Sequence, residues 1–410
     1  MSRTTVLIAT LDTKGEEAEY IRDRIVALGG AVTIIDIGVV GDPMITPDVS
    51  REEVAAAGGT ELAVLLEDPT REAAAPVMAA GAGEILRRLI HAGQAHAVLG
   101  LGGTQGTSSC SQIMQTLPYG FPKLIVSTVA SGDTSPFVGI KDITMMFSVS
   151  DLMGLNPFTA RILANAAAAA YGMSLTEGSV EAAGGDKPLI AMTNLGVLTE
   201  GATRAVKYFR EAGYDVVVFH AVGSGGRAME QLMKDGVVGA VFDYAMGEIA
   251  DDVFGGLRAG GPERLTVAGS LGLPQVICPG GAEHLGLFVE ANTVPEEYRD
   301  HLYVFHSPVI FVPRLNRDEF VRVAEEICAR LQNTTGNAVF MLPLRGVARY
   351  SIPGGPLHDP EGDQAFFKAI KAGMPPGIEV VEVDAEAEAP EFVREAVRRL
   401  VAMLESESES

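Results

Sequence analysis

An apolar segment that runs directly into a glycine-rich loop is the feature that most constrains the fold of this chain. Residues 97–101 are apolar throughout, which is typical of a strand in a parallel sheet covered on both faces. The loop after them is rich in glycine and hydroxyl side chains, and a helical pattern follows. Glycines let a backbone approach a ligand closely, and N–H groups at a helix start favour an anion. Because the loop is neither G-x-G-x-x-G nor a Walker P-loop, a phosphate cradle and a plain strand–helix turn both stay open.

Similar apolar strands alternate with amphipathic helices along the whole chain. The expected strands are 5–9, 32–37, 97–101, 123–128, 143–147, 189–192, 216–220, 240–242, 275–278, 309–312, 338–342 and 379–383. This alternation predicts an α/β fold with two doubly wound, Rossmann-like domains and mainly parallel sheets. We expect an N-terminal nucleotide-binding domain over 1–183, a linker at 184–188, a C-terminal α/β domain over 188–404 and a disordered acidic tail over 405–410.

Charge and cysteine content argue against several classes of partner. The 410 residues carry 53 acidic and 31 basic side chains, a formal net charge of −22, which disfavours binding to nucleic acids and anionic membranes. Three cysteines without a C-x-x-C pair indicate a cytoplasmic location. Cys110 follows the glycine loop and is either a reactive thiol or simply a small residue packed at a helix start. Neither a signal peptide nor a membrane span is predicted.

Two further polar loops are expected beside the glycine loop, because the carboxyl ends of parallel strands meet at one edge of a sheet. One follows the first strand, and the other is the hydroxyl-rich segment 127–134. Lys14 would pair with a phosphate and Asp12 with Mg²⁺ or a ribose hydroxyl; the alternative is a helix start capped by Thr13. The predicted phosphate or nucleotide site comprises Asp12, Thr13, Lys14, Gly102, Gly103, Thr104, Gly106, Thr107, Ser131 and Asp133.

A second glycine loop follows the strand that ends at His220 and predicts a second anion site. The residues assigned to this site are Gly223, Ser224, Gly225, Gly226, Arg227 and Arg314. His220 and Glu283, which is followed by His284, are candidate catalytic acid–base residues, although His220 is alternatively structural. Glu248 and Asp252 lie four apart on one helix, as a metal or general-base pair or as a solvated acidic face. No Cys/His zinc spacing occurs, and the metal content stays open.

Several of these segments occur together, in the same order, in a known family. They are TLDTKG (10–15), LGGTQGT (101–107), PKLIVSTVASGD (122–133), DITMM (142–146), VFHAVGSGGRAME (218–230), VPEE (294–297) and PGGPLHDP (353–360). The chain thus resembles the Tm-one-like ATP-binding domain family over nearly its whole length. The resemblance implies two Rossmann-like domains, ATP binding with or without Mg²⁺, and self-association into a homodimer or larger homo-oligomer. It implies no particular reaction.

The chain departs from the family pattern at three places. Residues 244–247 replace a threonine-rich run, residues 281–284 lack an aspartate, and residues 385–390 replace a His-Ile-Asn-Asp segment. All three departures lie in the second domain, and the first two fall in its candidate site, whereas the N-terminal loops match. The resemblance therefore implies an ATP site in the first domain.

Three functions are consistent with these observations. The first is a cytoplasmic ATP-binding protein whose first-domain glycine loops hold the phosphates. The second is an enzyme for a small phosphorylated or carboxylated metabolite in an interdomain cleft, with His220 or Glu283 moving protons. The third is a non-enzymatic scaffold or subunit with a structural ATP site.

Overall fold

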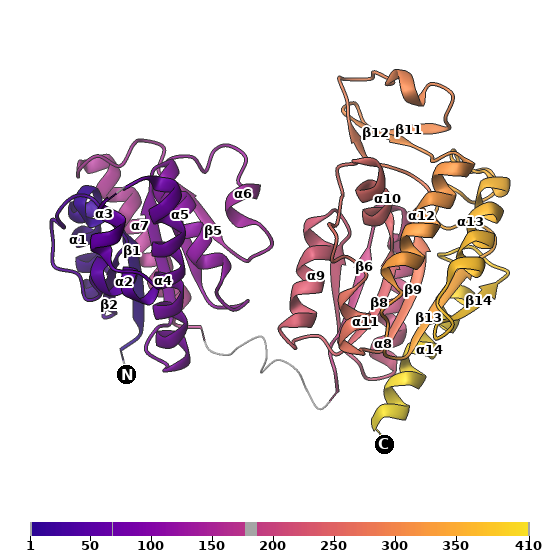
Figure 1. The fold of residues 1–410 in the computed structure, drawn as a ribbon, viewed down its shortest axis with the longest axis horizontal. Helices are drawn as coiled ribbons and strands as arrows, with labels where there is room; N and C mark the ends of the chain where they lie inside the picture. Colours follow the sequence, from indigo (N-terminus) through magenta and orange to yellow (C-terminus); the bar gives the residue numbers. More distant parts are fainter. Residues whose placement is uncertain (1, 68, 177–186, 409–410) are drawn as a thin grey trace. The chain divides into compact units, whose positions relative to one another are not determined.

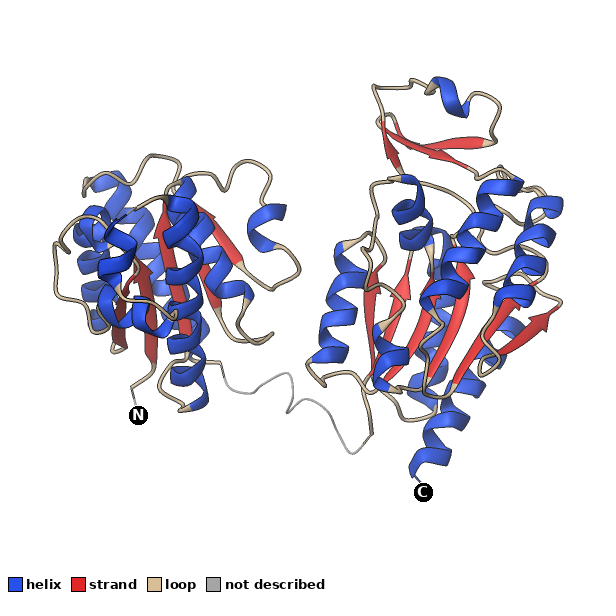
Figure 2. Cartoon of the chain, viewed as in Figure 1, coloured by secondary structure: helices blue, strands red, loops and turns tan. Residues whose placement is uncertain are grey.

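The computed structural model of the chain describes residues 2–67, 69–176 and 187–408 and contains two compact units, each an α/β layer structure (Figures 1 and 2). Unit 1 is Met1–Ala183 and unit 2 is Gly184–Ser410. The expected linker at 184–188 lies mostly outside the described residues. The sheets of both units confirm the predicted fold class of two α/β domains with mainly parallel strands.

Unit 1 is built on a five-stranded parallel sheet in the order β2-β1-β3-β4-β5. Its strands are β1 (Thr4–Ala9), β2 (Ala31–Asp36), β3 (Ala97–Gly102), β4 (Lys123–Ser127) and β5 (Thr144–Phe147). Its helices are α1 (Leu11–Ala27), α2 (Arg51–Ala57), α3 (Leu62–Glu67), α4 (Arg71–His91), α5 (Thr104–Gln115), α6 (Ser135–Val138) and α7 (Pro157–Ser174).

Alternation of side chains along the strands gives unit 1 two cores. On β1, Val6 and Ile8 face a core that includes residues of α2, α4 and α5. Leu7 and Ala9 face the opposite core, which includes residues of α1 and α7. Both faces of the sheet are thereby covered, which explains why its inner strands are apolar throughout.

Unit 2 has a six-stranded parallel sheet in the order β14-β13-β9-β8-β6-β7. Its strands are β6 (Ile190–Asn194), β7 (Val216–His220), β8 (Ala240–Ala245), β9 (Gln275–Gly280), β13 (Ala338–Pro343) and β14 (Glu379–Val383). Its helices are η2 (Gly196–Leu198), α8 (Thr199–Glu211), α9 (Ser224–Lys234), α10 (Gly247–Phe254), α11 (Val267–Leu271), η3 (Glu296–Tyr298), α12 (Arg317–Arg330), α13 (Pro360–Gly373) and α14 (Pro390–Ser408). One core includes residues of α8 and α14, and the other includes residues of α10, α12 and α13.

Two details of unit 2 differ from the sequence prediction. The strand expected at 309–312 is β12 (Ile310–Pro313), which pairs antiparallel with β10 (Leu287–Phe288) and β11 (Tyr303–Ser307) in a separate small sheet. The tail expected to be disordered from 405 is helical through Ser408, because α14 continues past the buried Leu404. Among the described helices, none combines the length and apolar character needed to cross a membrane.

Candidate functional site

The loops predicted to bind a phosphate share one edge of the unit 1 sheet. β1 lies between β2 and β3 and pairs parallel with both, and β3 pairs parallel with β4. The chain goes from β1 to β2 in one direction along the sheet and from β3 to β4 in the other. The gap between β1 and β3 is therefore a topological switch point, where ligands bind in open α/β sheets. The loops after β1, β3 and β4 all begin at this carboxyl edge.

The loop after β1 carries Asp12, whose carboxyl group has one oxygen without a partner among the described atoms. Asp36, at the end of β2, accepts hydrogen bonds from the N–H groups of Leu11 (3.1 Å) and Gly38 (2.8 Å), and burial raises its pKa. Asp12 lies in the first turn of α1, just after β1, and its Oδ1 is buried without a hydrogen-bond partner among the described atoms. Such an oxygen is a position where a cation or hydroxyl would be stabilised.

The two neighbours of Asp12 are placed differently from it. Lys14 Nζ donates to the backbone oxygen of Leu152, so its ammonium is anchored at this edge. Thr13 is exposed, and its hydroxyl lies 3.0 Å from that of Thr10. The alternative in which Thr13 caps α1 is wrong, because the N-cap position is occupied by Thr10, which makes no side-chain capping bond.

Some residues of the loop after β3 are packed in the interior, and others are accessible. A Cβ at Gly102 would lie 2.6 Å from the Cα of Gly106, so this pair lets α5 close onto the strand. Thr107 is buried, with its hydroxyl 2.8 Å from that of Ser127. Gly103 and Thr104 remain accessible: Gly103 is the extended N-cap of α5, no side chain caps the helix, and a Cβ there would meet its nearest atom only at 3.7 Å.

The loop after β4 contributes exposed groups. Ser131 and Asp133 are both exposed. Asp133 accepts a hydrogen bond from the N–H of Ser135 at 2.9 Å, and hydrogen bonding to Ser135 lowers the pKa of Asp133. These residues lie at the same edge of the sheet as Asp12 and Gly103 but stay farther from the protein interior.

In unit 2, backbone N–H groups of the second glycine loop already bind a side-chain carboxyl group of the protein itself, that of Glu248. Glu248 Oε1 accepts hydrogen bonds from the N–H groups of Gly223 (2.6 Å) and Gly226 (3.0 Å), at the start of α9. A Cβ at Gly226 would lie 2.1 Å from Glu248 Oε2, which explains that glycine. The predicted second anion site is therefore wrong at this loop, because an internal carboxylate occupies the helix start.

Glu248 also belongs to a buried charge cluster around Arg264, a residue that no motif in the sequence singles out. Arg264 is fully buried and forms a bidentate pair with Asp243, with Nη2 2.6 Å from Oδ1. Its Nε donates to Glu248 Oε2 at 2.7 Å, and Nη1 lies 3.4 Å from Glu230 Oε1. Three carboxyl groups thus surround one guanidinium. Burial raises the pKa of Glu230 to about 7, against the lowering effect of Arg264.

The acidic pair and the arginines expected near this loop have other roles. Glu248 is fully buried and Asp252 pairs with Arg330 at 2.6 Å, so they form neither a solvated face nor a metal pair. Arg314 is buried and donates to Leu357 O and Asp363 Oδ1, both at 2.7 Å, so it clamps a loop to α13 instead of binding a ligand. Arg227 and Ser224 are exposed and Gly225 packs against His220 O, where a Cβ would lie 1.9 Å away.

The candidate acid–base residues lie at or just behind a cavity of about 680 Å³ in unit 2. His220, at the end of β7, lines it together with His284. Glu283 is fully buried, with Oε1 3.0 Å from His284 Nδ1. Burial raises the pKa of Glu283, but His284 and Arg314 outweigh this effect and hold it below its ordinary value. In the described part of the chain, no group of three or more His, Cys, Asp or Glu side chains is arranged to hold a metal ion.

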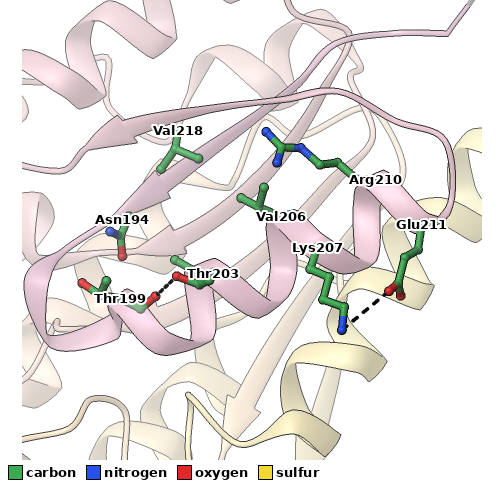
Figure 3. Close-up of a pocket in the computed structure, with 9 residues that line it drawn as sticks. Asn194, Thr199, Thr203, Val206, Lys207, Arg210, Glu211 and Val218 are labelled. Atoms are coloured by element: carbon green, nitrogen blue, oxygen red, sulfur yellow. Dashed lines mark hydrogen bonds and ion pairs between the residues drawn. The ribbon is translucent and has the colours of Figure 1, made fainter.

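A second hollow in unit 2, of about 600 Å³, runs along α8 beside β7 (Figure 3). Its threonine, lysine and glutamate side chains are paired with each other or with the backbone, whereas Asn194 Oδ1 is buried without a hydrogen-bond partner among the described atoms. Thr203 donates to the backbone oxygen of Thr199 at 2.8 Å, and Lys207 lies 3.8 Å from Glu211. Of the residues that line this groove, Asn194 is thus one whose polar group is left for a small ligand.

The two parallel-sheet units and their loop-built edges define the class of this protein: a two-domain, Rossmann-like α/β protein. Family models refine this class. Residues 3–178 match the N-terminal domain and residues 187–404 the C-terminal domain of the uncharacterised protein family UPF0261. The chain belongs to this family.

Relatives of known sequence agree with the family assignment. A UPF0261 protein of Clostridium tetani is 37% identical over 406 residues, covering 99% of this chain and 100% of that protein. The ToMV resistance protein Tm-1(GCR237) of Solanum lycopersicum is 33% identical over 277 residues, covering 67% of this chain and 37% of that protein. A solved structure described as a putative UDP-N-acetylglucosamine 2-epimerase from Listeria monocytogenes aligns over 100% of this chain and 97% of that chain, with 11% identity and a TM-score of 0.23.

Proposed function

We propose that this protein binds a nucleotide, with ATP as the ligand, at the carboxyl edge of the unit 1 sheet. The observation that carries the proposal is the start of α5 at the switch point between β1 and β3. In the described structure no side chain caps this helix of 12 residues, and the space in front of Gly103 is open. The first N–H groups of a helix lack intrahelical partners and attract phosphate. The resemblance carried by residues 10–15 and 101–107 supports ATP as the nucleotide.

The neighbouring loop after β1 carries side chains that fit a magnesium–nucleotide complex. Asp12 Oδ1 is a buried oxygen that lacks a partner among the described atoms, and Mg²⁺ prefers oxygen ligands. Lys14 donates one hydrogen bond to Leu152, whereas an ammonium group has three donors. We infer that Asp12 would hold the ion and Lys14 the phosphates. The ion would supply charge neutralisation to the phosphates.

Isothermal titration calorimetry with ATP, ADP and AMP, each with and without Mg²⁺, tests the proposal. The expected result is binding that weakens from ATP to AMP, because the phosphates make the main contacts. Gly103→Val should weaken ATP binding at least tenfold, since the new side chain would occupy the space in front of the α5 start. Its backbone is already extended, so this substitution introduces no strained φ angle.

Gly172→Ala is the matched control for the glycine substitution. A Cβ at Gly172, near the end of α7, meets nothing within 4 Å, so the control should bind ATP like the parent protein. Asp12→Asn should weaken binding in the presence of Mg²⁺ more than in its absence. Unchanged ATP affinity in Gly103→Val would exclude this site, and absence of binding by every nucleotide would refute the proposal as a whole.

A further inference from the structure

The cavity of about 680 Å³ in unit 2 is lined by residues that have no part in the nucleotide binding proposed for unit 1. It lies where β6 and β7 end, next to the switch point between β6 and β8. Its wall is contributed by segments far apart in the sequence, from the loop after β6 to the loop before α13. The lining residues that the argument uses are His220, Val222, Arg258, His284, Arg349 and Tyr350.

The ionisable groups on this wall are basic or phenolic. Among the described residues, no aspartate or glutamate lines the cavity. The carboxylates that neutralise its arginines stand outside the wall. Arg258 pairs with Asp251 through two hydrogen bonds of 2.9 Å, and Arg349 pairs with Glu388 at 3.1 and 3.2 Å. In both pairs the cationic residue lines the cavity and the anionic residue does not, so the wall favours a negatively charged ligand.

Arg258 is held in one position by its neighbours. Besides the two bonds to Asp251, its Nη2 donates to the backbone oxygen of His284 at 2.8 Å and its Nη1 to His284 Nε2 at 3.3 Å. A guanidinium has five N–H groups and cannot accept a hydrogen bond. The contacts in the described structure therefore fix the orientation of Arg258. A cation that is already oriented loses little entropy when it binds a ligand.

The same contact involves His284. Because Arg258 only donates, the contact is a hydrogen bond when His284 Nε2 is unprotonated, and the ring proton then lies on Nδ1, on the side of Glu283. Nδ1 is 3.0 Å from Glu283 Oε1, although the two atoms do not meet hydrogen-bond geometry. Both oxygens of Glu283 are buried without a hydrogen-bond partner among the described atoms. Glu283 is therefore a buried acidic group behind the cavity wall whose hydrogen-bonding capacity is not used within the described structure.

Arg349 is the most available cation on the wall. Its Nε and Nη2 contact Glu388 and its Nη2 also lies 3.7 Å from Glu200 Oε1, whereas Nη1 has no hydrogen-bond partner within the described part of the chain. Its backbone N–H donates to the oxygen of Val197 at 3.2 Å, which ties the loop to the end of β6. The side chain is 45% exposed, so an incoming ligand can reach it.

We propose that this cavity is a binding site for a small organic anion, a carboxylate or phosphate monoester attached to an apolar body. Arg349 and the oriented Arg258 contact the anionic group, and the apolar part of the wall covers the rest of the ligand. Leu195, Val197, Val222, Leu257, Ile310 and Val312 belong to that apolar part, together with Phe288. The site lies entirely within unit 2 and does not depend on the nucleotide proposal.

Ligand-observed NMR and calorimetry on the full chain test this proposal with benzoate, phenyl phosphate and benzyl alcohol as probes. Benzoate or phenyl phosphate should bind at least tenfold more tightly than the neutral alcohol. The stronger of the two anions identifies the natural head group. Arg349→Met should weaken anion binding at least fivefold. Lys207→Met is the matched control, because it removes an exposed cation from the groove of Figure 3 and should leave the dissociation constant unchanged.

A second variant keeps the charges and fills the space. Val222→Trp places an indole at a partly exposed position on the wall and should abolish binding of both anions. Circular dichroism establishes that each variant is folded. Equal affinity for benzoate and benzyl alcohol, or an unchanged affinity in Arg349→Met and Val222→Trp, would overturn the assignment.

Discussion

Glu230→Gln should make unit 2 more stable at alkaline pH while leaving it almost unchanged near pH 5. Glu230 is one of three carboxyl groups around Arg264, and its Oε2 is buried without a partner among the described atoms. Burial raises its pKa from 4.5 to about 7 in the folded protein. The folded state therefore binds more protons than the unfolded state between these values, and the stability falls as the pH rises through this window.

The magnitude follows from the same two pKa values. At about 1.4 kcal/mol for each pH unit between them, ionisation of Glu230 costs unit 2 about 3 kcal/mol above pH 7. Glutamine cannot ionise, and its amide oxygen can still accept the hydrogen bond from Leu265 N–H, which is 2.7 Å long. The variant should therefore lose this pH dependence.

Pulsed thiol labelling across a urea gradient measures the stability of each unit separately. Cys110 is buried in unit 1, while Cys278 and Cys328 are buried in unit 2, so mass spectrometry of the labelled peptides reports both. Glu290→Gln, at an exposed position in unit 2, is the control and should change the free energy of unfolding by less than about 0.5 kcal/mol. Equal stability of Glu230→Gln and the parent protein at both pH 5 and pH 8.5 would refute the reasoning.

Three further predictions concern the glycine loops and the thiol of unit 1. Glu248→Ala should destabilise unit 2 by about 3–5 kcal/mol in urea unfolding, because it leaves the buried Arg264 with one partner fewer; a change below about 1 kcal/mol would contradict the cluster. Gly102→Ala should destabilise unit 1 by about 1–3 kcal/mol, because the new Cβ would overlap the backbone of Gly106. Gly103→Ala should change the free energy of unfolding by less than about 0.5 kcal/mol, because its Cβ has room. Equal effects of the two substitutions would contradict the assignment of Gly102 to packing and Gly103 to an accessible position. Cys110, whose pKa burial raises to about 12, should resist iodoacetamide in the folded protein, and rapid alkylation would show that it is accessible.

The elements of regular structure were largely predictable from the sequence. The strands expected at 216–220 and 379–383 have the same bounds in the structure as β7 and β14. Their apolar residues are flanked by turn residues, so local sequence decides where each strand begins and ends. The tail from 405 was not predictable in this way, because serine and glutamate are compatible with both a disordered segment and the last turns of a helix such as α14.

The chemistry of the loops was less predictable, because it depends on partners distant in the sequence. The loop at 223–226 has the composition of an anion site, and it does hold a carboxylate. Only the fold shows that this carboxylate is Glu248, supplied by α10. The sequence likewise identifies Arg314 as a cation, but it does not show that its buried partner is Asp363, 49 residues further along the chain. In unit 1 the equivalent helix start, at α5, has no such internal partner within the described structure.

Hydrogen–deuterium exchange measured by mass spectrometry, with and without ATP and Mg²⁺, tests the nucleotide site of unit 1 most directly. Bound phosphates would protect the N–H groups at the start of α5. We predict slower exchange in peptides covering 10–15 and 102–108, with no change at the loop 223–227, where Glu248 already occupies the N–H groups. Protection at 223–227, or none at 102–108 under conditions where ATP binds, would contradict this account.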